Sequence, residues 1–491
     1  GGALSFTAER CAQLGATRLE LGANDVADIT GQLCPTTGPL FQFGHGAWRV
    51  QGVARGLKAA IPFLQVAASE ADGPLSLASK GGELALSADI RRVRLADTAT
   101  DPRFHPLQAH GAAQLANRNW TGDFALTDPA GRALAQAHLI HDGRTGAGGV
   151  SLDTGALAFA PKGLQPSALS PKAAMIGDPA EGSARFQGHV DWTPGGSTSG
   201  GALDVSRLDF MSPAGAVTGL KGRIVFTSLA PLVAAPGQSL KADAVAALTP
   251  LTDAQVTFGL DHDAVQVSGA GFGLSGGAVR VEPFEIPFAG GTWRAAVTLD
   301  NVELSDLVEA SPFADRMDLK AKVSGRIPFT MTPQGVRIEG GELHAVTPGR
   351  ISIRRDALTG VQGAGGAPQV DPKAPVAAAA VTAVASADPY SDFVYQAMEN
   401  LSFDALTAEV ASRPGGRLGV IFHIKGEHDP PKKAEITLTA REVLTRRITR
   451  TLPLPSGTQV DLTLDTSVNL DQLLGDLADY QRLRGSRPVQ P

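Results

Sequence analysis

Aromatic, charged and sulfur-containing side chains are scarce in this chain of 491 residues. Aromatic residues make up 5% and charged residues 19%, whereas 57 glycines and 33 prolines are spread along the chain. So few aromatic residues exclude dense aromatic cores, and frequent glycine and proline indicate frequent turns. The composition therefore favours one repetitive β-protein over the three globular domains that the length alone suggests.

The chain also lacks an excess of positive charge. Lysine and arginine number 43 against 49 acidic residues, so the formal net charge is −6. A nucleic-acid-binding protein needs a basic surface to hold phosphates, and the few arginine clusters here, such as Arg446 and Arg447, have no aromatic residues between them. We therefore expect no nucleic-acid partner.

There are only two cysteines, Cys11 and Cys34. Two cysteines permit one disulfide, and their spacing fits no zinc motif. A secreted or periplasmic chain would oxidise such a pair, whereas a cytosolic chain would keep both thiols reduced. The sequence leaves open whether the two residues are bridged or are two small buried hydrophobic side chains.

Long hydrophobic runs are absent. No stretch approaches the roughly 18 to 20 apolar residues needed to cross a bilayer; the nearest, the alanine-rich stretch from Val376, is shorter and weakly hydrophobic. The chain opens with GGALSF, without a methionine, a basic n-region or an apolar h-region. We therefore expect that this chain does not span a membrane by itself and that its natural N-terminus lies upstream.

Motifs for catalysis or metal binding fail in their context. GFGLSG at 271–276 fits a glycine-rich nucleotide loop, but an alternating strand follows it, whereas a phosphate loop must open a helix. GGSTSGG at 195–201 is interpreted as a loop. His138 and His141 lie three residues apart, which on a strand places them on opposite faces, and the polar residues 427–429 are interpreted as a turn. We predict no enzyme activity, no metal and no cofactor.

Strand alternation is what the sequence contains in abundance. RLGVIFHIKG at 417–426 places four large apolar residues on one side of an extended strand. Similar short runs, separated by glycine, proline, aspartate and asparagine turn signals, recur from Gly1 to about Gly360 and again from Leu401 to Leu464. Helical patterns are few: one begins near Asn301, one near Ser391, and a terminal amphipathic one near Asn469 either docks on the last strand or contacts a membrane or a partner.

These patterns predict a mostly β fold. We expect an elongated, curled antiparallel sheet that forms an open apolar groove, a β-taco or bridge-like architecture with a few short helices. The alternative is a closed sandwich whose two sheets bury the same faces against each other. We expect repetitive β-groove segments at 1–222 and 223–360, a flexible insertion rich in alanine, proline and glycine at 361–389, and a β domain at 390–491 that ends in the amphipathic helix.

Large apolar residues at alternating positions are the candidate lining of that groove. Branched aliphatic side chains in a row suit acyl chains better than a rigid aromatic pocket does. The predicted lining residues are Leu418, Val420, Phe422, Ile424, Ile436, Leu438, Leu462, Leu464, Met317, Leu319, Val323, Ile327, Phe329, Met331, Val336, Ile338, Val256, Phe258, Ile224 and Phe226.

The C-terminal part resembles the YdbH family. The resemblance lies in YQAMENLSFDAL from Tyr395, in the strand LGVIFHIKGEHDP that ends at Pro430, and in LTLDTSVNLDQLL from Leu462. Stretches from Arg223 onward also resemble the middle region of that family, whereas the first two hundred residues match it only in their repetitive texture. The resemblance covers roughly one hundred residues specifically.

The resemblance implies a function. YdbH proteins belong to the AsmA-like group, elongated periplasmic proteins of Gram-negative bacteria thought to carry phospholipids between the inner and outer membranes along an apolar β-groove. It also implies an N-terminal inner-membrane anchor, not present in this chain, and a YnbE-like outer-membrane lipoprotein that adds strands to the sheet at the C-terminal end. The alternative is a structural β-repeat or scaffold protein of the cell envelope that transports no lipid.

Overall fold

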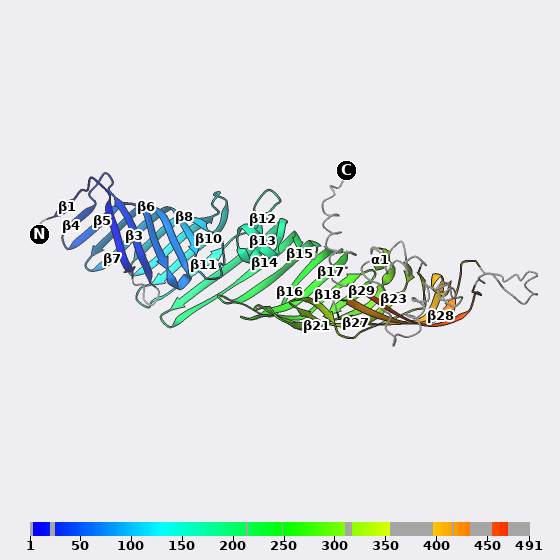
Figure 1. Ribbon diagram of the computed structural model, residues 1–491. Coiled ribbons are helices and arrows are strands. Elements are labelled where there is room, and N and C mark those ends of the chain that lie inside the picture. Colours follow the sequence, from blue (N-terminus) through cyan, green and yellow to red (C-terminus); the bar gives the residue numbers. More distant parts are fainter. Residues whose placement is uncertain are drawn as a thin grey trace, which may run out of the picture. The chain divides into compact units, whose positions relative to one another are not determined.

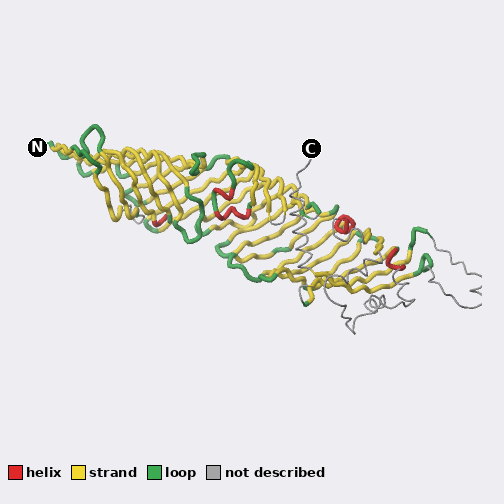
Figure 2. The backbone as a smooth tube through the Cα atoms, turned by 45° about the horizontal axis from the view of Figure 1, so that its top comes forward, coloured by secondary structure: helices red, strands yellow, loops and turns green. Residues whose placement is uncertain are grey.

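The computed structural model describes residues 3–19, 25–212, 215–247, 249–309, 317–353, 396–414, 417–432 and 454–469. The chain divides into two compact units: unit 1 comprises Gly1–Leu240 with Leu260–His262, and unit 2 comprises Lys241–Gly259 with Asp263–Pro491. The described residues are mostly strands of one antiparallel sheet (Figures 1 and 2). The predicted β class is therefore confirmed.

Unit 1 is an antiparallel meander. Its strands are β1 (Leu4–Phe6), β2 (Ala12–Leu19), β3 (Val26–Cys34), β4 (Phe41–Gly44), β5 (Ala47–Ile61), β6 (Val66–Lys80), β7 (Glu83–Asp97), β8 (Leu107–Ala116), β9 (Asn119–Thr127), β10 (Ala133–Asp142), β11 (Ala147–Asp153), β12 (Leu157–Phe159), β13 (Gly177–Thr193), β14 (Gly196–Ser212) and β15 (Gly215–Leu229). From β5 to β11 each strand pairs with the next in sequence, and the pairing continues from β11 to β13, β14 and β15. Figure 1 shows these strands side by side in chain order.

The first strands of unit 1 are arranged around β5. β4 and β3 pair with successive parts of β5, β1 pairs with β4, and β2 pairs with β3. A disulfide joins Cys11 to Cys34, next to the Ala12–Leu33 pair of β2 and β3. This bond links two strands that are already neighbours in the sheet.

Unit 2 continues in the same antiparallel way. Its strands are β17 (Leu251–Leu260), β18 (Ala264–Leu274), β19 (Gly277–Val281), β20 (Phe284–Pro287), β21 (Trp293–Glu303), β22 (Met317–Lys320), β23 (Lys322–Thr332), β24 (Gly335–Ile338), β25 (Gly341–Ala345), β26 (Gly349–Ile353), β27 (Leu401–Arg413), β28 (Arg417–His428) and β29 (Gln459–Asn469), while β16 (Leu232–Ala246) crosses the boundary between the units. β21 pairs with β23, β23 with β25, β25 with β27, β27 with β28 and β28 with β29. Among the described strands no pairing joins the first strands of the chain to the last, so the sheet is open.

Several strands of unit 2 are interrupted. β22 and β23 lie on either side of Ala321 and pair with β26 and β25, which are separated by a short turn. β19 and β20 both pair with β18. β23 and β24 form an antiparallel hairpin across the turn at 333–334, as the strand alternation and turn signals in this part of the sequence predict.

A β-bulge keeps one face of β27 apolar. In the sequence Leu401 and Phe403 occupy odd positions, whereas Leu406 and Val410 occupy even ones. The register shifts between Phe403 and Ala405, so that all four face the same side. Simple alternation does not predict this change of phase.

Helices are short and few. α1 (Leu304–Glu309) lies in the segment where one helix was predicted, and residues 396–399 are helical within another. Three 3₁₀ turns occur at η1 (Pro62–Leu64), η2 (Pro166–Ala168) and η3 (Pro171–Met175). The insertion predicted at 361–389 and the terminal helix predicted from Asn469 lie outside the described residues. None of the helices among the described residues has the length and apolarity needed to cross a bilayer.

Candidate functional site: the apolar face of the sheet

The strand register of unit 2 builds one continuous apolar face. Directly opposed residues of neighbouring strands point to the same side of a sheet. From this rule three rows can be followed across unit 2: Leu319, Ile351 and Leu401; Ala408 and Phe422; Trp293, Met331 and Val336. Strands that are separate in sequence therefore contribute to a single surface.

Most of the predicted lining residues of unit 2 lie on this face. Phe329 is opposite Ile338, Val323 is opposite Ala345, and Ile424 is opposite both Leu406 and Leu462. The predicted residues on the face are Leu319, Val323, Ile327, Phe329, Met331, Val336, Ile338, Leu418, Val420, Phe422 and Ile424. The backbone register pairs Met317 with Ile353, Leu462 with Ile424 and Leu464 with Phe422. Val256 and Phe258 lie in β17, and Ile436 and Leu438 lie outside the described residues.

One part of the face in unit 2 is covered by the chain itself. Val302, Leu401 and Phe403 are each 0% exposed and belong to a packed cluster that also contains Leu319, Val323 and Ile424. Leu304, Leu307 and Val308 of α1 pack against this cluster, and Met398 of the helical residues 396–399 is part of it. This part of the face is an ordinary hydrophobic core.

The rest of the face in unit 2 is partly exposed. Ile327, Phe329, Met331, Leu418 and Val420 all retain intermediate solvent exposure. Phe329 contacts Trp293 edge to face, with ring centroids 5.9 Å apart, and Trp293 stacks on Phe284 at 5.1 Å. These side chains offer apolar surface that no other described segment buries.

Charges are kept on the opposite face. Arg326, which alternates with Ile327, forms an ion pair with Glu282 at 2.6 Å, and Lys425 pairs with Asp461 at 3.6 Å. The Arg326 guanidinium lowers the pKa of the Glu282 carboxyl and so favours its charged form. The two faces therefore differ sharply in polarity.

Unit 1 has an apolar face of the same kind. Its register places Val50, Leu77, Leu86, Leu115 and Trp120 in one row from β5 to β9. The predicted lining residues Ile224 and Phe226 lie on the same face of β15, opposite Leu203 and Gly201.

A hydrogen-bonded aromatic pair lies in this row and escaped the sequence analysis. His141 and Trp192 are 5% and 4% exposed, and both face Gly148 across the ladder. Burial lowers the pKa of His141 below its ordinary value of 6.5. His138, on the opposite face, contacts Asp123 instead, as the strand interpretation predicts.

His428 is a second buried histidine. It ends β28 opposite Leu401 and is 5% exposed, so the polar residues at 427–429 are more than a surface turn. Burial lowers the pKa of His428, although a hydrogen bond with the Asn400 backbone acts to raise it. His428 and Ile424 are both at even positions of one strand, so alternation could have predicted that His428 lies on the apolar face.

Two glycine-rich motifs can now be placed. The stretch 271–276 forms the end of β18 and a turn into β19, so no helix follows it, as predicted. The loop interpretation of 195–201 is wrong, because Gly196 to Gly201 begin β14 and pair with β13. The ladder with β13 overrides the weak strand propensity of these residues.

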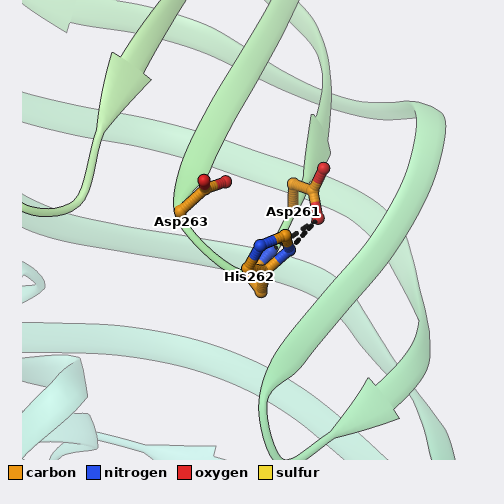
Figure 3. A group of neighbouring side chains, drawn as sticks. All are labelled: Asp261, His262 and Asp263. Carbon is orange, nitrogen blue, oxygen red and sulfur yellow. Dashed lines mark hydrogen bonds and ion pairs between the residues drawn. The ribbon is translucent and has the colours of Figure 1, made fainter.

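Asp261, His262 and Asp263 form the turn between β17 and β18 (Figure 3). In the described part of the chain they are the one group of three histidine, cysteine, aspartate or glutamate residues whose possible metal-ligand atoms all lie within 4.8 Å of one another. Oδ1 of Asp261 accepts a hydrogen bond from the backbone N–H of His262 at 2.7 Å. The same oxygen lies 2.6 Å from Nδ1 of the His262 ring (Figure 3). Hydrogen bonding within a turn explains this exposed arrangement.

An open antiparallel sheet with an uncharged face on one side and ion pairs on the other defines a large β-protein whose distinctive surface is apolar. A family model described as YdbH-like, intermembrane phospholipid transport protein YdbH, matches residues 8–364. The chain belongs to this family of lipid transport proteins. No curated protein and no solved structure matches the chain.

The family match confirms the predicted family but extends over a different range. The expectation that the first two hundred residues match the family only in their texture is wrong, because the family model matches the chain from residue 8. The match ends at residue 364, before Tyr395, where the recognised C-terminal motifs begin. The predicted divisions after residues 222, 360 and 389 remain predictions.

Proposed function

We propose that the apolar face is a groove along which phospholipids pass between the inner and outer membranes. The observation that carries the proposal is the continuous apolar face with partly exposed residues, such as Phe329 and Val420, in a member of a phospholipid transport family. Acyl chains lie against this face, and headgroups remain in water.

The energetics suit transfer without a deep trap. Burial of a CH₂ group contributes roughly 0.8 kcal/mol, so a tail of about 16 carbons gains on the order of 10 kcal/mol on leaving water. A bilayer offers the same gain, so the groove needs only to match it. Aliphatic contacts are non-directional and allow a tail to slide from one strand to the next.

Two substitutions test the groove. Val420→Asp places a charge on the partly exposed apolar face, whereas His423→Asp places the same charge on the opposite face of the same strand. We expect Val420→Asp to abolish phospholipid transfer between donor and acceptor vesicles and His423→Asp to leave it unchanged. Equal transfer by two stably folded variants would contradict the assignment.

The scaffold alternative makes a different prediction. The packed cluster around Phe403 shows that part of the face is ordinary core, and a scaffold would use all of it in that way. Native mass spectrometry with organic extraction separates the two functions: a lipid groove retains phospholipids during purification, and a scaffold is free of lipid when fully folded.

The proposed setting is the periplasm of a Gram-negative bacterium. The Cys11–Cys34 disulfide supports an oxidising compartment. In this proposal a segment outside this chain anchors the protein in the inner membrane, and a YnbE-like lipoprotein of the outer membrane adds a strand at the C-terminal end. Co-purification of such a lipoprotein with the chain, and its loss when the last strand is deleted, tests that contact.

A further inference from the structure

The apolar face of unit 1 is exposed unequally at its two rims. On β7, Leu84 is 46% exposed at one end, whereas Val93 is 7% exposed at the other. At the first rim Phe43 is 45% exposed; at the second Ala109 is 3% exposed. The same face therefore changes from open to buried across the width of the sheet.

The buried rim is formed by long connections that are bonded to one another. Arg103 donates to the carboxylate of Asp97 at 2.8 Å and to the carbonyl of Leu64 at 2.7 Å. The Ser170 hydroxyl donates to the Arg103 carbonyl at 2.6 Å. These bonds tie together the connections that follow β5, β7 and β12.

Part of this loop rim also packs on the apolar face. Leu164 is buried in a cluster with Val205 and Leu208, and Leu169 packs against it. A connection that places apolar side chains on the face leaves no room for another molecule there. The loop rim is therefore closed.

The exposed rim consists of tight hairpin turns at 45–46, 81–82 and 117–118. In each turn two successive residues have positive φ, as in His45 with Gly46 and Asn117 with Arg118, which is the arrangement of the tightest hairpins. Such turns are too short to fold over the sheet. The side chains beside them, Phe43 and Leu84, stay in solvent.

Cations lie on these turns. Lys80 and Arg118 are exposed, and neither forms an ion pair within the described part of the chain, although Glu83 lies opposite Lys80 across its hairpin. Lys80 is the last residue of β6 and alternates with Ser79, which is opposite Leu84, so Lys80 lies on the opposite face. A phosphodiester next to an apolar tail would meet Arg118, which lies in the turn itself, at the edge of the face. Large exposed apolar groups beside cations fit a phospholipid.

We infer that phospholipids enter and leave unit 1 over the hairpin rim of β4 to β9, with acyl chains against Phe43, Trp48 and Leu84 and the phosphate near Arg118. This inference rests on the proposed groove function and specifies its route. The loop rim serves as the closed wall.

Photo-crosslinking tests the route on the full chain. A benzophenone amino acid replaces Leu84, Phe329 or Ile140, and each protein is illuminated with vesicles of phosphatidylethanolamine and ³²P-labelled phosphatidylglycerol. Ile140 is the matched control, since it is 51% exposed but lies on the opposite face. We expect about fivefold or more labelling at Leu84 and Phe329 relative to Ile140, because each of these two residues lies on the apolar face of its own unit.

The outcomes separate the route from the function. Labelling at Phe329 with only control labelling at Leu84 overturns the hairpin-rim route and leaves the groove function intact. Labelling no higher than the control at both positions overturns the route and the groove function together.

A charge experiment tests the phosphate contact independently. Arg118→Gln is compared with Lys80→Gln, which removes a cation from the opposite face at the same rim, and with Lys162→Gln, an exposed lysine at the loop rim. We expect Arg118→Gln to lose about half or more of its labelling at Leu84, because it removes the local cation, and the two lysine variants to retain it. Unchanged labelling in Arg118→Gln overturns the phosphate contact.

Discussion

The indole N–H of Trp192 donates a hydrogen bond to Nδ1 of His141 across 3.2 Å, joining β13 to β10 over the intervening strand. Because Nδ1 accepts this bond, a neutral His141 carries its proton on Nε2, a buried atom without a hydrogen-bond partner. A second proton would have to occupy the acceptor position. The pair is therefore stable only while the imidazole is neutral.

Stability is expected to fall as the pH drops below about 7. Burial lowers the pKa of His141 and His428 below 6.5, so in that window the unfolded chain binds more protons than the folded one. The free energy of unfolding then rises with pH. His141→Gln, which keeps an acceptor but cannot titrate, should show a shallower dependence of Tm between pH 5 and 7. His138→Gln is the control, and an equal change in both variants would contradict the prediction.

Gly148 should not tolerate a side chain. A Cβ there would lie 2.7 Å from the Trp192 ring and 2.6 Å from the Ile140 carbonyl. We expect Gly148→Ala to destabilise unit 1 by about 1 to 3 kcal/mol through overpacking, measured by chemical denaturation. Gly269→Ala meets no atom within 4 Å and serves as the control. A neutral Gly148→Ala would show that Trp192 can move aside.

Loss of the disulfide should loosen the first strands. Cys11 and Cys34 are 23 residues apart in sequence, and closing a loop of this size typically stabilises a protein by about 2 to 4 kcal/mol. The Cys11→Ser, Cys34→Ser double variant should show faster amide hydrogen exchange in β2 and β3 than in β8. The wild type in reducing agent should behave alike; slower exchange in either sample would refute the expectation.

Asp97 should contribute more to the stability of the folded chain than an exposed acidic residue does. Its side chain is 1% exposed and bonds to Arg103, which holds the pKa of the carboxyl well below its usual range. Asp97→Asn should cost about 2 kcal/mol, since hydrogen bonds to charged groups are the strong ones. Asp72→Asn removes an exposed pair with Arg92 and should cost less than about 1 kcal/mol. Similar costs for the two variants in denaturant titrations would contradict this ranking.

Alternation predicted which residues share a face, because the side-chain period of a strand is fixed by its backbone geometry. Ile327, Phe329 and Leu418 lie where that rule places them. The rule does not reveal what lies over a face. α1 packs against the cluster that contains Val323, whereas Phe329 stays partly exposed. This difference depends on tertiary packing, which a two-residue period does not predict.

Other features depended on contacts between distant residues. The bulge after Phe403 is set by pairing with β28, and the Arg103 bonds join connections 38 and 67 residues apart in sequence. The pairing of Cys11 with Cys34 needed the β2–β3 register, which the sequence leaves open. Local sequence patterns do not predict which of these distant residues come into contact.

The strand order of β5 to β11 makes the chain extensible in an evolutionary sense. Within this stretch each of the strands β6 to β10 hydrogen-bonds only to its sequence neighbours, so duplication or loss of one hairpin, such as β8 with β9, leaves the remaining ladders and their facing pattern intact. Each hairpin changes the width of the ladder by about 9.6 Å, twice the strand spacing. Related chains can thus differ in the width of this ladder by changing the number of hairpins.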